Sequence, residues 1–233
     1  MRDLILAAAL TAALTGASCT KRFVRLNYSC TDASTRLQAA WIALEEARSQ
    51  ASGCELLSNG MDRCEDLRLQ IEHIAQDCPN DVQALMANAV LAYDEKQFVK
   101  SQQFLDSLFS LRETYPEAAV LRARLALEEG NVPFALRYLE QQIRLSPDHA
   151  GLRELHASAL YSAGRLDEAR NSLTTAERLG APAWRIAYGR GLIEEAAGQT
   201  AAARMYYEAA LRARPGFKPA ESRLRGLDAS PGK

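Results

Sequence analysis

A repeat of 34 residues begins near residue 82 and restricts what this chain can fold into. Four segments align at this shift, with similar residues in four columns. The aligned columns are Lys96, Gly130, Gly164 and Gly198; Phe98, Val132, Leu166 and Thr200; Ser101, Ala135, Ala169 and Ala203; and Leu105, Leu139, Leu173 and Tyr207. A period of this length is typical of stacked helix pairs.

The residue types in the repeat suit helices that pack closely. A small residue recurs in the first half of each copy and a proline near its end: Ala89, Ala123, Ala157 and Gly191, then Pro116, Pro147, Pro182 and Pro215. Small residues let two helices approach, glycine ends the first helix, and proline prevents continuation of the second. Alanine and leucine are abundant and β-branched residues scarce, which favours an all-α chain.

Two stretches carry a resemblance to the tetratricopeptide repeat (TPR) family. Residues 164–169, Gly-Arg-Leu-Asp-Glu-Ala, are very similar to the family's turn, and residues 207–215 to its second helix. The resemblance covers residues 82–217 and implies an α-solenoid of stacked antiparallel helix pairs, with four repeats over 80–217. Residues 218–233 are predicted to be a capping helix and tail, because a solenoid needs a polar cover on its last repeat.

Four cysteines lie in the part of the chain that precedes the repeats. Helical spacing of apolar residues over 34–51 and 64–78 predicts a divergent helical hairpin over 34–79. In an antiparallel hairpin the inner ends meet and the outer ends meet, so we expect the disulfides Cys54–Cys64 and Cys30–Cys78. The spacing does not suit a zinc site.

The N-terminus resembles a secretory signal. Leu4–Leu14 is an apolar run after Arg2, too short to cross a membrane. Residues 14–19 resemble a bacterial lipoprotein cleavage site, which predicts a signal peptide over 1–18, lipidation of Cys19, and an anchor and linker over 19–33. Ordinary cleavage after Ala17 or Ser18 is the alternative. Under the lipoprotein interpretation, Thr20 points to the outer membrane and a location in the periplasm.

Sequence motifs for catalysis are missing. The chain has no phosphate loop, nucleophile elbow, metal-binding helix motif or dinucleotide fingerprint. His149 and His156 lack a placed catalytic partner, and the paired glutamates resemble solvated helix faces. A net charge of −1 disfavours nucleic-acid binding. We expect no enzyme activity, cofactor or metal.

The family resemblance implies a partner-binding groove lined by the first helix of each pair. Carried onto this chain, its positions are Met86, Val90, Tyr93, Val120, Arg124, Leu127, Glu154, Ser158, Tyr161, Tyr188, Leu192 and Glu195. This apolar and aromatic mixture suits a protein interface. The lysine and asparagine set with which some TPRs clamp a carboxylate is missing.

A polar ladder occupies a column where the family usually has large apolar residues: Asn88, Arg122, His156 and Arg190. Either these side chains reach solvent along their helices, or they face a ligand. Residues 204–225 carry an excess of basic side chains, which suits a solvated end helix or an acidic partner.

The sequence therefore predicts a non-enzymatic scaffold or adaptor of the bacterial cell envelope, which binds a peptide or partner helix and sits on a membrane through a lipid anchor. The alternatives are a periplasmic enzyme or cell-wall-binding accessory that uses the polar ladder, and a soluble secreted scaffold.

Overall fold

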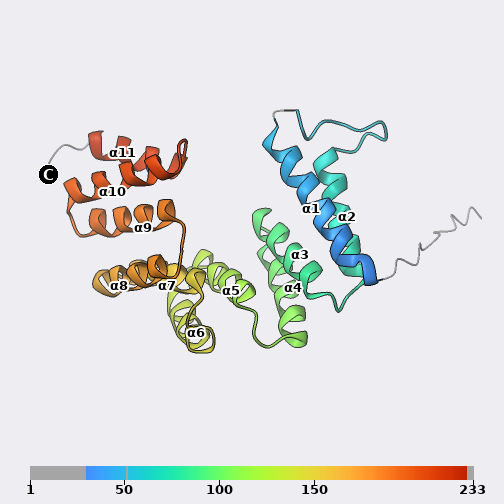
Figure 1. The fold of residues 1–233 in the computed structure, drawn as a ribbon, viewed down its shortest axis with the longest axis horizontal. Coiled ribbons are helices and arrows are strands. Elements are labelled where there is room, and N and C mark those ends of the chain that lie inside the picture. The colour runs from blue at the N-terminus through green and yellow to red at the C-terminus, as the bar shows by residue number, and fades with distance from the viewer. Residues whose placement is uncertain (1–29, 51, 230–233) are drawn as a thin grey trace, which may run out of the picture.

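The computed structural model describes residues 30–50 and 52–229, and within these ranges the chain is helical with no strand. An isolated antiparallel bridge joins Leu56 and Asp62. In chain order the elements are η1 (Cys30–Asp32), α1 (Ala33–Ser49), α2 (Arg63–Asp77), α3 (Val82–Asp94), α4 (Phe98–Leu111), α5 (Pro116–Glu128), α6 (Val132–Leu145), α7 (Ala150–Ser162), α8 (Leu166–Arg178), α9 (Ala183–Ala196), α10 (Thr200–Ala213) and α11 (Lys218–Ala229). The predicted all-α solenoid of antiparallel helix pairs is confirmed (Figure 1).

The turn column of the repeat ends the first helix of each pair. Gly130, Gly164 and Gly198 adopt positive φ angles of 75°, 74° and 75°, which a residue without a side chain adopts readily. Lys96 occupies the same place in the first copy and also has a positive φ, 59°. Beyond each turn residue, the next backbone N–H donates to a carbonyl five residues back, as from Arg165 to Leu160 at 2.9 Å. The sequence repeat is thus a repeat of one helix-ending turn.

The small-residue column lies where the two helices of a pair cross. Ala89, Ala123 and Ala157 are all buried, and so is Gly191. The leucine column of the second helix is buried in the same cores. Close helix approach therefore depends on these small side chains.

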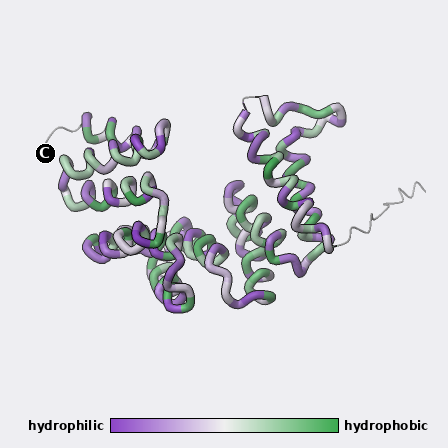
Figure 2. Tube along the Cα trace, viewed as in Figure 1, coloured by the Kyte–Doolittle hydropathy of each residue, from purple (hydrophilic) through white to green (hydrophobic). Residues whose placement is uncertain are grey.

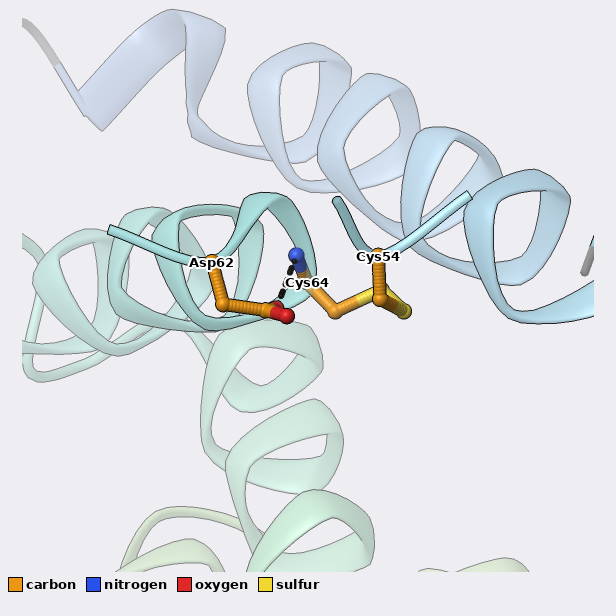
Figure 3. Close-up of side chains that lie close together, drawn as sticks. All are labelled: Cys54, Asp62 and Cys64. Carbon is orange, nitrogen blue, oxygen red and sulfur yellow. Dashed lines mark hydrogen bonds between the residues drawn. A yellow bond between two sulfur atoms is a disulfide. The ribbon is translucent and has the colours of Figure 1, made fainter. Parts of the chain in front are cut away.

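Two disulfides close the α1–α2 hairpin, and both were predicted. Cys30 and Cys78 join the outer ends, with Cα atoms 5.6 Å apart, and Cys54 and Cys64 join the inner ends at 5.1 Å. Figure 3 shows Asp62 beside the second bridge, where its carboxylate accepts the backbone N–H of Cys64 at 2.8 Å and so caps α2.

The helix pairs follow an open arc from α1 to α11 (Figure 1). Successive first helices contact one another, α1 with α3 and onward to α9, whereas successive second helices touch little or not at all. The first helices therefore form the inside of the arc. Apolar and polar residues alternate along the helices (Figure 2), and no helix among the described residues is long and apolar enough to span a membrane.

Candidate protein-interaction groove

The predicted groove residues lie on the four inner helices α3, α5, α7 and α9, and we call this surface the inner face. Eleven of the twelve predicted residues are half-buried, and Ser158 is exposed. The apolar and aromatic members also pack against the cores of their helix pairs: Met86, Val90, Tyr93, Val120, Leu127, Tyr161, Tyr188 and Leu192. Each of these side chains thus contacts the core of its helix pair on one side and is open to solvent on the other.

A polar contact ties the first two inner helices together. The Tyr93 hydroxyl on α3 donates to Glu128 Oε1 on α5 at 3.0 Å, and the Arg124 guanidinium lies 6.0 Å from the Tyr93 ring centre. Burial and the neighbouring Glu128 carboxylate raise the pKa of Tyr93 to about 12. The phenol is therefore a neutral donor at physiological pH.

Similar contacts join α9 to α7, to its own second helix and to the terminal helix. Arg185 on α9 pairs with Glu154 on α7 at 3.2 Å. Glu195 accepts the Tyr207 hydroxyl at 2.5 Å and pairs with Arg223 of α11 at 3.2 Å. Burial, with Glu195 beside it, raises the pKa of Tyr207. Two predicted groove glutamates, Glu154 and Glu195, thus hold helices together.

The polar ladder contacts second helices. Buried Asn88 donates to the Ile71 carbonyl of α2 at 3.1 Å, and Arg122 pairs with Asp106 of α4 while stacking over Phe109. The other two members contact α8. Nδ1 of His156 lies 3.1 Å from Ser172 Oγ, and Arg190 pairs with Glu177 at 2.6 Å. Burial lowers the pKa of His156. These contacts favour a packing role for the ladder.

The inner face holds a small pocket between α7 and α9. Its volume is about 110 Å³, and its lining includes the predicted groove residues Ser158, Tyr161 and Leu192. Gly189 of α9 and Leu173 of α8 also line it, and neither was singled out as a site residue. The signal for Gly189 was present, because its 34-residue column holds larger apolar residues in the other copies.

The remaining sequence candidates have structural contacts. His149 accepts the Leu152 N–H at 3.2 Å and caps α7. In the basic segment, Arg204 pairs with Asp228 and Lys218 with Glu221, so much of its charge is offset. Cys19, its lipidation and the signal peptide lie outside the described residues.

A cluster of possible metal ligands among the described residues comprises Cys54, Asp62 and Cys64. Both sulfur atoms belong to a disulfide and the Asp62 carboxylate caps a helix (Figure 3), so this cluster does not fit a metal ion.

Comparison with known proteins agrees with the geometry. A tetratricopeptide repeat family model matches residues 120–170 and 154–216. A TPR protein from Parabacteroides merdae is similar in structure, with a TM-score of 0.66 at 16% identity over 88% of this chain and 73% of that one. A thermophilic TPR protein from Thermus thermophilus has a TM-score of 0.67 at 16% identity, over 85% and 100%.

A third similar structure is YrrB, described as a TPR protein with an unusual peptide-binding site. Its TM-score is 0.50 at 14% identity, over 85% of this chain and 99% of that one. No curated protein sequence matches this chain significantly. At such identities the structural likeness shows the fold alone.

Proposed function

Since this chain is a tetratricopeptide repeat protein, we propose that it is a non-enzymatic adaptor that binds a peptide or helix of a bacterial envelope protein on its inner face. The observation that carries the proposal is that α3, α5, α7 and α9 each place at least one half-buried apolar or aromatic side chain on the inner face, and that these helices contact one another in sequence. Such side chains, held by a core beneath and partly open above, are the usual anchors of protein interfaces.

Two further features support a binding role. The Tyr93–Glu128 contact joins α3 to α5 and the Arg185–Glu154 pair joins α7 to α9, which helps to hold these parts of the inner face in place before a partner binds. YrrB, which has the same fold, is described as having a peptide-binding site. No observation favours an enzyme or a cell-wall-binding protein that uses the polar ladder, because those side chains contact second helices.

The proposal places the protein on the periplasmic side of the outer membrane. It rests on the sequence pattern alone: an apolar run over Leu4–Leu14 and Cys19 in a lipoprotein-like context. A diacyl chain on Cys19 would hold the protein stably at a membrane surface without a spanning helix. The partner is then an envelope protein, and the adaptor assists the assembly of its complex.

The test is photo-crosslinking in whole cells. A photoreactive residue at Leu127 on the inner face is compared with one at Gln141, which is exposed on the second helix α6. The expected result is one dominant envelope protein captured from position 127 and not from 141. Equal capture from both positions, or none, would contradict binding on the inner face.

The location is tested in parallel with Cys19→Ala. We expect this variant to leave the membrane fraction, and palmitate labelling to disappear with it. An unchanged location would contradict the lipid anchor and support a soluble secreted scaffold, while leaving the inner-face test unaffected.

A further inference from the structure

The pocket between α7 and α9 has apolar walls and no charged lining residue. Its apolar lining residues include Leu173, Leu192 and Ile193, and Tyr161, also in the lining, is half-buried. The exposed residues Ser158 and Ser162 belong to its lining, so the pocket opens toward the inner face. Burying a charge in such a site without a partner is costly, so its occupant is uncharged.

The repeat explains why the pocket is there. Position 189 aligns with Leu121 and Leu155 at the 34-residue shift. Leu121 packs against α3 and α4, and Leu155 against α5 and α6, so each fills the junction with the preceding helix pair. Gly189 faces α8 in the same way, because a Cβ added to it would lie 3.0 Å from Leu173 Cδ1. The fourth repeat therefore lacks one leucine side chain at this junction.

We propose that the pocket binds one uncharged aliphatic side chain, of about the size of leucine, from the partner that occupies the inner face. This inference rests on the proposed function and narrows it to partners with such a residue. The volume of about 110 Å³ is well above the roughly 10–15 Å³ that one water molecule needs by the same measure, and the walls offer apolar contact to a branched side chain.

The serines at the mouth suit the backbone of the same partner residue. The Ser162 hydroxyl donates to the Ser158 carbonyl at 3.1 Å, and the Ser158 hydroxyl to the Glu154 carbonyl at 3.4 Å. Each hydroxyl has thus used its donor, and its oxygen lone pairs are left to accept an N–H. An aliphatic side chain with its own backbone N–H matches both features of the pocket.

Gly189→Leu is the decisive variant, because it supplies the missing side chain from within the protein. The glycine lies inside α9 and has no positive φ, so the backbone accepts a side chain, and the contact to be relieved is the flexible end of Leu173. The matched control is Gly226→Leu. Gly226 also lies in a helix, α11, and has open space around it.

The first measurement is an amide NMR titration of the full chain with N-acetyl-leucinamide and N-acetyl-alaninamide. We expect saturable shifts at α7 and α9 with the leucine compound, and binding weaker by about tenfold or more with the alanine compound. The shifts are expected to vanish in Gly189→Leu and to persist in Gly226→Leu. No saturable shift, or the same shifts in Gly189→Leu, would overturn the proposal.

The second measurement separates this inference from the proposed function. Crosslinking from position 127 is repeated in the Gly189→Leu and Gly189→Ala backgrounds. The expected result is at least a tenfold loss of capture in Gly189→Leu and a smaller loss in Gly189→Ala. If Gly189→Leu fails to fold, Gly189→Ala together with the two compounds still decides the matter. Undiminished capture in Gly189→Leu would contradict binding of a partner side chain in the pocket, but not the proposed adaptor function. Binding of the leucine compound without any capture from position 127 would contradict the adaptor function, but not the pocket.

Discussion

Gly191 and Tyr207 occupy complementary positions across the α9–α10 crossing. A Cβ atom added to Gly191 would lie 2.4 Å from Cε1 of Tyr207, so the buried ring fits only because the glycine has no side chain. In each of the other three repeats, alanine and leucine hold these two columns. The fourth repeat therefore has glycine and tyrosine where the others have alanine and leucine, and the smaller residue makes room for the larger one, so that the crossing stays closely packed.

This exchange predicts strong coupling between the two positions. We expect Gly191→Ala and Tyr207→Leu each to lower the free energy of unfolding by about 1–3 kcal/mol, the first through overpacking and the second through lost contacts. The double variant restores the alanine–leucine pair found in the other repeats. Its loss of free energy of unfolding should be smaller, by at least about 1 kcal/mol, than the sum of the losses in the two single variants. Urea unfolding of the four proteins measures the cycle, and simple additivity would contradict the explanation.

The two disulfides are expected to contribute unequally. Cys30–Cys78 closes a separation of 48 residues and Cys54–Cys64 one of 10. In the chain-entropy view, replacing both cysteines of the longer bridge by serine costs about 4 kcal/mol, and for the shorter bridge about 3 kcal/mol. Denaturant midpoints of the two double-serine variants test this order. A larger loss from removing the shorter bridge would show that native-state contacts, rather than loop closure, dominate.

The Tyr93–Glu128 contact predicts a pH dependence above pH 10. The pKa of Tyr93 is about 12 in the folded chain and lies near 10 when unfolded. The folded state therefore holds this proton more tightly, and the stabilisation is complete below pH 10 and lost as the pH rises toward 12. Tyrosinate absorbance followed against pH should show one late-titrating tyrosine fewer in Tyr93→Phe. If the part of the titration curve near pH 12 is the same in Tyr93→Phe as in the wild type, another tyrosine is the one that titrates late.

Neighbouring residues on α9 should separate the packing face from the binding face. Arg190 pairs with Glu177 of α8, whereas Leu192 lines the inner-face pocket. We expect Arg190→Ala to change stability by less than about 1 kcal/mol, because the pair is partly exposed, and to leave partner capture unchanged. Leu192→Ala should reduce capture from position 127 at least tenfold. A larger loss of capture in Arg190→Ala than in Leu192→Ala would indicate that the polar ladder, and not the inner face, binds the partner.

The helices, their turns and both disulfide pairings were predictable because each depends on residues close in the chain or on a pattern repeated in it. Glycines at a fixed period marked the turns, and the hairpin's symmetry selected the cysteine pairs. The inner-face residues were named from the family resemblance, and the structure brings them onto neighbouring first helices. What they bind stays a prediction, and so does the fate of Cys19.

Local pattern determined which residues form each helix pair, because helix ends and helix crossings are specified by short-range spacing. The tertiary structure decided what each face of a helix meets. One residue along a helix turns by about 100°, so Gly189, Arg190 and Gly191 face three different surroundings: a pocket, a neighbouring carboxylate and a buried ring. Their separate roles depend on the preceding and following helices, and only the stacking of the pairs brings those helices into contact.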